Sequence, residues 1–320
     1  MSLHTPLCSQ LGIAKPVFLA GMGGVAYADV CAAVSEAGGF GTLGMATGTP
    51  DGIREEMRKV RAQTDKPFGV DLLAALPSTV DAAIDIIIEE GATAFIAGLG
   101  VPEKVVDRCH EAGLLVMSMC GKVAHAVRAA EAGCDVVVAQ GTEAGGHTGR
   151  VAGMALIPQI VDAVEIPVLA AGSIVDGRGL AAALAFGADG VWMGTRFIAS
   201  HEARAAEGYK KRITEIRDED TAVTRGYSGK PMRVVRNRYV DEVEAHPEQI
   251  LPFPDQMAAS IQDGLLAPLG GRQDIDTDIA CLPCGQGAGG IHEILSCAEI
   301  IDEVMRDAEA TIERISRLRK

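Results

Sequence analysis

The chain has few aromatic residues, and its basic residues are outnumbered by acidic ones. Aromatic side chains make up 4% of the 320 residues, with a single Trp, and 43 Asp and Glu against 29 Lys and Arg give a net charge of −14. A nucleic-acid-binding surface needs a basic face for phosphates or aromatic platforms for bases. The composition therefore argues against nucleic acid as a partner.

Long hydrophobic runs and a dense set of cysteines are also lacking. No stretch reaches the roughly 18 apolar residues of a membrane span. Residues 1–11 carry neither a basic leader nor the apolar run of a signal peptide. Eight Cys are too sparse for a secreted disulfide scaffold. We expect a cytoplasmic protein with reduced thiols and no membrane partner.

What the chain does have is a repeating pattern of short apolar runs, rich in β-branched residues, that alternate with helix-like stretches. The eight predicted strands are 16–21, 40–44, 67–73, 94–100, 114–120, 136–141, 167–172 and 190–197. The seven helices predicted between them are 27–37, 50–62, 80–90, 103–112, 123–132, 155–164 and 180–186. Eight units at regular spacing favour a closed (β/α)8 TIM barrel, with a doubly wound open sheet as the alternative.

The pattern stops after the eighth run. Residues 203–238 are dense in charge, and prolines at 231 and between 247 and 254 interrupt any long helix. Residues 291–319 have helical spacing and would supply the helix that the eighth strand lacks. The sequence therefore predicts an α/β protein with a TIM barrel of residues 1–200 and 276–320. A smaller, mainly helical lid domain of residues 201–275 is inserted before the last barrel helix, over the C-terminal mouth.

Two glycine-containing turns end the seventh and eighth predicted strands, where barrels of this kind often hold a phosphate. Residues 170–173 read AAGS and residues 193–196 read MGTR. Glycine lets backbone amides approach phosphate oxygens, and the hydroxyls add donors. We expect Gly172, Ser173, Gly194 and Thr195 to bind a phosphorylated ligand.

A histidine stands in a glycine-rich loop after the sixth predicted strand, in the sequence QGTEAGGHTG of residues 140–149. Its flanking glycines place His147 outside the predicted helices and strands, which favours a catalytic role. A neutral imidazole near its ordinary pKa of about 6.5 suits a general base. Glu143 is the alternative base, or else a surface carboxylate. The first strand ends in the side-chain-poor turn LAGMGG, 19–24, which leaves room for a flat ligand.

Several other motifs carry less weight. Neither G-x-G-x-x-G match, at 39–44 or 285–290, lies in the strand, loop and helix order of a dinucleotide site. A single C-x-x-C at 281–284 lacks a second ligand pair, so no metal site is predicted. Arg233, Arg236 and Arg238 are either an anion site or, more often for such clusters, a solvated face.

Five segments together resemble the FMN-dependent nitronate monooxygenases, also called 2-nitropropane dioxygenases, which are related to the FMN-dependent enoyl-acyl-carrier-protein (enoyl-ACP) reductases. They are AGMGG at 20–24, FGVD at 68–71, QGTEAGGH at 140–147, AAGS at 170–173 and MGTRF at 193–197. The likeness covers residues 12–200 and returns at 285–289. It implies a TIM barrel with a lid, an FMN cofactor, and His147 as the catalytic base. The cofactor-binding residues that it implies are Ala20, Gly21, Met22, Gly23, Asp71, Gln140, Gly145, Gly146, Gly172, Ser173, Gly194 and Thr195.

The resemblance includes two departures and leaves several activities open. Asp71 replaces the usual Asn beside the flavin, and Met119 stands where some members have a Lys, for which Lys122 is the candidate substitute. The implied activity is that of a nitronate monooxygenase flavoprotein, which oxidises alkyl nitronates with O2. The alternatives are an enoyl-ACP reductase or acyl-CoA thioester oxidoreductase, with NAD(P)H in the reductase case, and a flavin-free phosphometabolite-binding barrel. The partner is a small molecule, and a homo-oligomer is left open.

Overall fold

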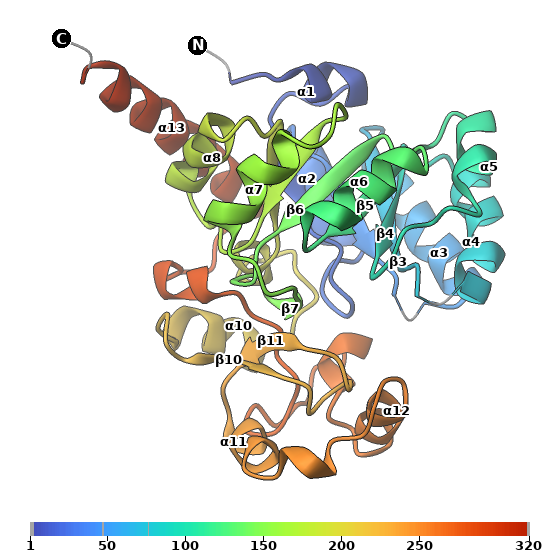
Figure 1. The fold of residues 1–320 in the computed structure, drawn as a ribbon, viewed down its shortest axis with the longest axis vertical. Coiled ribbons are helices and arrows are strands. Elements are labelled where there is room, and N and C mark those ends of the chain that lie inside the picture. The colour runs from blue at the N-terminus through green and yellow to red at the C-terminus, as the bar shows by residue number, and fades with distance from the viewer. Residues whose placement is uncertain (1–2, 47, 76, 319–320) are drawn as a thin grey trace.

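The computed structural model describes residues 3–46, 48–75 and 77–318, and its main body is a closed barrel of eight parallel strands (Figure 1). The strands are β1 (Val17–Leu19), β2 (Gly41–Gly44), β3 (Phe68–Leu73), β4 (Ala94–Gly98), β5 (Leu115–Cys120), β6 (Val136–Gln140), β8 (Val168–Ala171) and β9 (Gly190–Met193). They pair in the order β1-β9-β8-β6-β5-β4-β3-β2. Hydrogen bonds between Phe40 and the backbone of Val17 and Leu19 join β1 to β2 and close the ring. The predicted TIM barrel is confirmed.

Eight helices surround this barrel. They are α2 (Ala28–Glu36), α3 (Pro50–Arg61), α4 (Pro77–Glu89), α5 (Val106–Glu111), α6 (Val123–Glu131), α7 (Gly153–Val161), α8 (Gly177–Ala185) and α13 (Cys297–Ser316). As predicted, the last helix of the chain packs between α8 and α2. It begins at residue 297 because Ser296 and Glu299 form a capping box. Among the described residues, no helix is long and apolar enough to cross a membrane.

A short helix that the strand and helix pattern did not predict closes the N-terminal end of the barrel. In α1 (Pro6–Leu11), Leu7, Cys8 and Leu11 are buried against the side chains that fill the barrel interior. These interior side chains include Phe18, Ile96, Met117, Val138, Leu169 and Trp192. The barrel is therefore filled at this end, so a ligand site is left to the C-terminal ends of the strands.

The eighth predicted strand is too long at its C-terminal end. It stops at Met193, and a helical turn, α9 (Thr195–Ile198), follows instead of more strand. The residues after Gly194, TRFI, gave no signal for this change, because Phe197 and Ile198 fit a buried helical turn as well as a buried strand.

The second unit lies below the barrel in Figure 1 and contains both helices and strands. Its elements are α10 (Glu207–Glu215), β10 (Thr221–Thr224), β11 (Met232–Val235), α11 (Arg238–Glu244), η1 (Pro247–Gln249), α12 (Asp255–Gln262) and η2 (Ala267–Gly270). The strands β10 and β11 pair antiparallel, and β11 also pairs with β7 (Gly146–His147) from the barrel loop. The lid therefore shares a small sheet with the loop that carries His147, which the prediction of a mainly helical lid did not include.

Candidate active site

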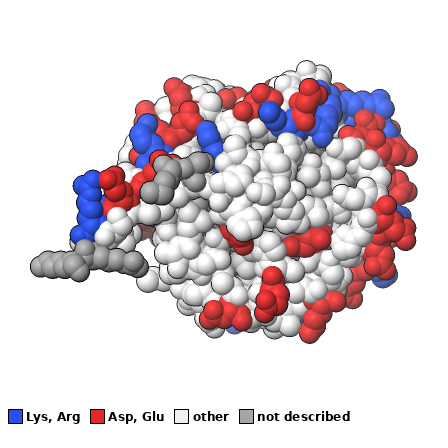
Figure 2. Space-filling model, turned by 90° about the horizontal axis from the view of Figure 1, so that it is seen from above, with Lys and Arg blue, Asp and Glu red and all other residues white. Residues whose placement is uncertain are grey.

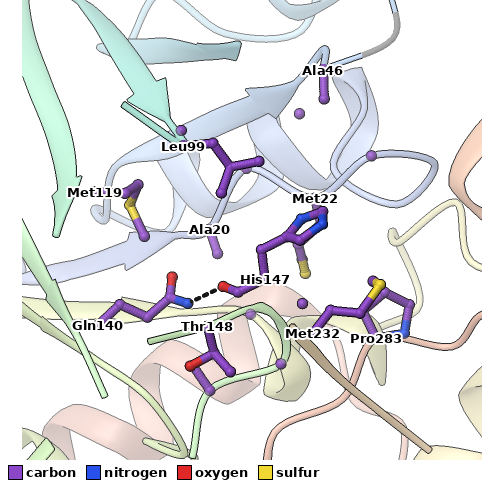
Figure 3. Close-up of a pocket in the computed structure, with 18 of the residues that line it drawn as sticks. Ala20, Met22, Ala46, Leu99, Met119, Gln140, His147, Thr148, Met232 and Pro283 are labelled. Carbon is purple, nitrogen blue, oxygen red and sulfur yellow. Dashed lines mark hydrogen bonds between the residues drawn. The ribbon is translucent and has the colours of Figure 1, made fainter. Parts of the chain in front are cut away.

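A cavity of about 1170 Å³ lies between the C-terminal ends of the barrel strands and the lid (Figure 3). The lid contributes Lys230, Met232, Met257 and Leu269 to its wall. All thirteen site residues predicted from the sequence line this one cavity: Ala20, Gly21, Met22, Gly23, Asp71, Gln140, Gly145, Gly146, His147, Gly172, Ser173, Gly194 and Thr195. The fold therefore brings together residues that are up to 175 positions apart, from Ala20 to Thr195.

The turns at Gly172 and Gly194 lie side by side because β8 and β9 are neighbours in the barrel. Gly172 has a φ of +119°, a conformation that essentially only glycine adopts without strain. No described residue accepts a hydrogen bond from the backbone amides of Gly172, Ser173, Gly194 or Thr195. Free amides at two adjacent turns form a cradle that suits a phosphate.

The two hydroxyls of this cradle differ from the sequence prediction. Ser173 Oγ donates to the Glu143 carbonyl at 2.8 Å and accepts from the Gly287 amide at 2.9 Å. The Ser173 hydroxyl proton is therefore already donated to a protein carbonyl. The expectation that both hydroxyls donate to a phosphate is corrected for Ser173. Thr195 Oγ1 accepts from the Gly285 amide at 3.0 Å, so its proton remains available. The glycine-rich segment 285–290 thus supports the cradle from behind.

The wall beside the cradle consists largely of bare backbone. A Cβ atom added to Gly44 would lie 2.4 Å from the backbone nitrogen of Met22, and one added to Gly21 would lie 2.3 Å from the Asp71 carboxyl. Both glycines therefore allow the chain to pack closely at the end of β1. The turn that they pack carries few side chains, and the planar ligand expected against it stays a prediction.

His147 projects from β7 into the cavity, where its position is fixed by three contacts (Figure 3). The Gln140 amide donates to the His147 carbonyl at 2.6 Å, and β11 holds the strand through the Met232 register. Ser228 Oγ lies 2.8 Å from the imidazole Nε2. The expectation that His147 lies outside any strand was wrong, because the lid provides the strand with which it pairs.

The pKa of His147 is far from the ordinary histidine value of about 6.5. Burial of the ring, together with the positive charge of Lys230, lowers the pKa to about 4. The imidazole is therefore neutral at physiological pH and can accept a proton, although it is a weaker base than an exposed histidine.

Glu143, the alternative base, has a structural position. Its carboxylate accepts the Gly153 amide at 3.0 and 3.1 Å and so holds the first turn of α7. Its two oxygens also face the space where a Cβ on Gly141 would lie. A carboxylate bound at a helix N-terminus is stabilised there, which leaves His147 as the candidate base.

The three arginines that the sequence offered as an anion site also have structural positions. Arg233 is buried in β11 and donates to the Thr142 carbonyl at 3.1 Å, while Arg236 and Arg238 form ion pairs with Asp241 and Glu242 on an exposed face. The three side chains therefore form no common anion site. Cys281 and Cys284 are buried free thiols. Within the described ranges, no group of three or more His, Cys, Asp or Glu is placed to hold a metal ion.

Asp71 lies in the cavity wall against Gly21, and burial raises the pKa of its carboxyl well above the ordinary range. The unfolded chain ionises this group near pH 3.9, whereas the folded chain keeps its proton to a higher pH. The group therefore lowers folding stability as pH rises above the unfolded value. We expect Asp71→Asn to stabilise the ligand-free protein by on the order of 1 kcal/mol at pH 8 and by much less at pH 4.

Thermal melts of both proteins at these two pH values test this expectation, with the exposed Asp274→Asn as the control. An equal difference in melting temperature between wild type and Asp71→Asn at pH 4 and pH 8 would contradict a raised pKa.

The lid residues of the site could not be found from the sequence. Ser228, Lys230 and Met232 all reach the cavity or His147, yet they lie in a charged segment with no recognisable motif. The local signal for β11 is weak and consists of the β-branched pair Val234 and Val235.

The fold and this site define a TIM-barrel enzyme in which two adjacent turns with unpartnered backbone amides among the described residues, a glycine-rich turn and a buried imidazole share one cavity. The family model described as nitronate monooxygenase matches residues 4–307, so the chain belongs to the nitronate monooxygenase family and is an oxidoreductase.

Three similar proteins fit this assignment. A 5-hydroxy-7a-methyl-1-oxo-octahydro-1H-indene-4-carboxyl-CoA dehydrogenase of Mycobacterium tuberculosis is 36% identical, with 99% of each chain covered. A probable nitronate monooxygenase of Staphylococcus saprophyticus is 33% identical over 80% of this chain and 85% of its own. The solved structure of FabK from Thermotoga maritima has a TM-score of 0.91 at 34% identity, with 98% of this chain and 99% of that chain covered.

Proposed function

We propose that this protein is an FMN-dependent oxidoreductase in which the barrel, residues 1–200 and 276–320, holds the flavin and the lid, residues 201–275, encloses the substrate. The observation that carries the proposal is the pair of adjacent turns at Gly172 and Gly194, whose amides donate to no described residue and which lie beside the glycine-rich turn 20–24. The amides of these turns and the Thr195 hydroxyl would hold the phosphate, and the turn 20–23 would lie along the ring. When bound, FMN supplies the electron-accepting chemistry, which side chains lack.

His147 is the residue that we assign to proton transfer. Its Nε2 is engaged by Ser228, and its Nδ1 makes no hydrogen bond to any described residue. The neutral ring can therefore take a proton at Nδ1 from the carbon beside a nitro group, or steer a substrate that arrives already ionised. Oxidation of an alkyl nitronate with O2 is the activity that the family assignment favours first.

The size of the cavity favours a second candidate, the oxidation or reduction of an acyl thioester. Ligand pockets usually measure about 300–1,000 Å³, and this cavity reaches about 1170 Å³. Such a volume leaves room for a substrate much larger than a nitronate beside the cofactor. One relative is named for a carboxyl-CoA substrate, which agrees with this candidate.

The test is whether the purified protein binds FMN and which substrate bleaches it. We expect a yellow protein, or a colourless one that FMN reconstitutes, with the flavin bleached by anaerobic addition of a nitronate. Bleaching by an acyl-CoA or NADPH instead would establish the second candidate. A colourless protein that cannot bind FMN would overturn the proposal and favour the flavin-free barrel.

Ser228 is expected to act as a positioning residue for His147. Removing its hydroxyl in Ser228→Ala takes away one hydrogen bond to the ring, so kcat for a neutral nitroalkane should fall about tenfold with FMN affinity unchanged. Ser228→Thr keeps a hydroxyl and should recover most of the rate. Ser260, also buried in the lid, provides the matched control Ser260→Ala. An equal loss in Ser260→Ala would show that the effect is one of lid stability.

A further inference from the structure

One part of the cavity wall carries positive charge that the flavin site does not use. Four basic residues at the mouth, Lys122, His125, Arg128 and Arg150, line the cavity, and we call them the basic rim. The only Asp or Glu among the lining residues is Asp71, although acidic residues outnumber basic ones in the chain as a whole. Figure 2 views the face remote from the lid, where Asp and Glu lie mainly toward the edge with Lys and Arg among them.

The fold places these four residues together from two loops. Lys122 is the N-cap residue of α6 (Val123–Glu131), and His125 and Arg128, three positions apart, lie on one face of that helix. Arg150 comes from the loop after β7, and the two loops touch through their glycines. A Cβ on Gly149 would lie 2.8 Å from the Gly121 carbonyl oxygen. Lys122 and Arg150, the residues that follow these glycines, are therefore neighbours at the mouth.

The rim is poorly neutralised within the protein. Arg128 forms an exposed ion pair with Glu103 at 3.0 Å, but no described carboxylate lies within 4 Å of the Lys122 or Arg150 side chains. The pKa of His125 is lowered by burial and further by the charges of Lys122 and Arg128. The unpaired charges of Lys122 and Arg150, beside an otherwise apolar cavity, attract a multiply charged anion and raise its local concentration.

We propose that the basic rim binds the phosphate groups of an adenosine nucleotide tail, with the rest of that ligand extending past the rim toward His147. Two ligands have this chemistry: a coenzyme A thioester, which carries a ribose 3′-phosphate and a diphosphate, and NADPH, which carries a ribose 2′-phosphate and a diphosphate. The inference deepens the proposed function, on which it rests, because it gives the site a substrate or electron donor far larger than a nitronate. Arg and Lys are the side chains that recognise such phosphates.

The test measures dissociation constants in the FMN-loaded protein for CoA, dephospho-CoA, pantetheine, NADPH and NADH. Lys122→Glu and Arg150→Glu should each weaken binding of CoA or NADPH at least tenfold, and pantetheine binding should not change. Arg314→Glu, on the exposed end of α13, makes the same change in net charge away from the cavity and is the control. FMN affinity should be the same in wild type, Arg150→Glu and Arg314→Glu.

The two sources give different results. If CoA binds more tightly than dephospho-CoA and does not bleach the flavin, the tail belongs to a thioester substrate. If NADPH binds more tightly than NADH and bleaches the flavin, the tail belongs to the electron donor. The inference is wrong if no nucleotide binds below millimolar concentration, or if the rim variants bind as the control does. Both of these contradicting results can occur in a protein that binds FMN normally. Failure to bind FMN would instead overturn the proposed function.

Discussion

Replacing His147 by Ala should slow oxidation of a neutral nitroalkane by about 10²-fold or more, because general acid–base catalysis typically contributes that much. The variant should still bind FMN, since the cradle at Gly172 and Gly194 lies on other strands. A preformed nitronate has already lost its proton, so its oxidation should be slowed much less. A larger loss of rate with the neutral nitroalkane than with its nitronate is the result expected when a base has been removed.

Steady-state rates with a nitroalkane and its nitronate, at equal FMN occupancy, measure this effect. His246→Ala, which removes an exposed histidine of the lid, is the control. Unchanged turnover of the neutral substrate in His147→Ala would remove His147 from the mechanism.

His147 should also determine how kcat/KM depends on pH. Since the pKa of His147 is lowered to about 4, the imidazole is neutral throughout the physiological range. The base is active only when deprotonated, so its contribution to kcat/KM should be constant between pH 6 and 8 and should fall as pH approaches 4. A rate that falls instead with a midpoint near 6.5 would show an exposed, unperturbed imidazole in the working enzyme.

The second large effect is expected from Gly172→Ala. At a φ of +119° any Cβ is strained, and here it would also lie 3.3 Å from a Glu143 carboxylate oxygen. Relief of strain, about 1–3 kcal/mol, would turn the amides of Gly172 and Ser173 away from the phosphate. We expect the dissociation constant for FMN to rise tenfold or more.

Gly113→Ala provides a matched control for this variant. Gly113 also has a positive φ, +74°, but no atom lies within 4 Å of its added Cβ, and it is outside the cavity. Both variants should lower the melting temperature of the ligand-free protein, and only Gly172→Ala should change FMN affinity in a flavin fluorescence titration. Unchanged affinity in Gly172→Ala would show that this turn does not hold the phosphate.

Much of the barrel could be predicted from the sequence because each strand and helix has its own local signal. The strands of a buried parallel sheet are continuous apolar runs, and seven of the eight ended within two residues of the predicted C-terminus. The eighth did not, because Thr195 and Phe197 are residues that favour strands, although they form a helical turn here. The glycine-rich turns at the strand ends could also be found, because each has a local sequence signal. A barrel places the C-terminal ends of all its strands at one face, so these turns could be assigned to one site.

The lid and its contacts could not be predicted in this way. The pairing of β7 with β11 depends on two segments about 85 residues apart that have no shared pattern. The bond from Ser228 to His147 follows only from that pairing. The use of the Ser173 proton by the Glu143 carbonyl depends equally on how the loops fold together.

The sequence by itself determined the eight-unit barrel, the end of the barrel that carries the cavity, and the two glycine-containing turns and His147 that line it. Periodicity and turn chemistry are local properties, and they can be seen in a run of ten residues. Only the tertiary structure decided that His147 is held by the lid and kept neutral by burial, that Glu143 caps a helix, and that a basic rim lies at the mouth. Protonation and contact depend on what surrounds a side chain in space, and distant segments supply those surroundings.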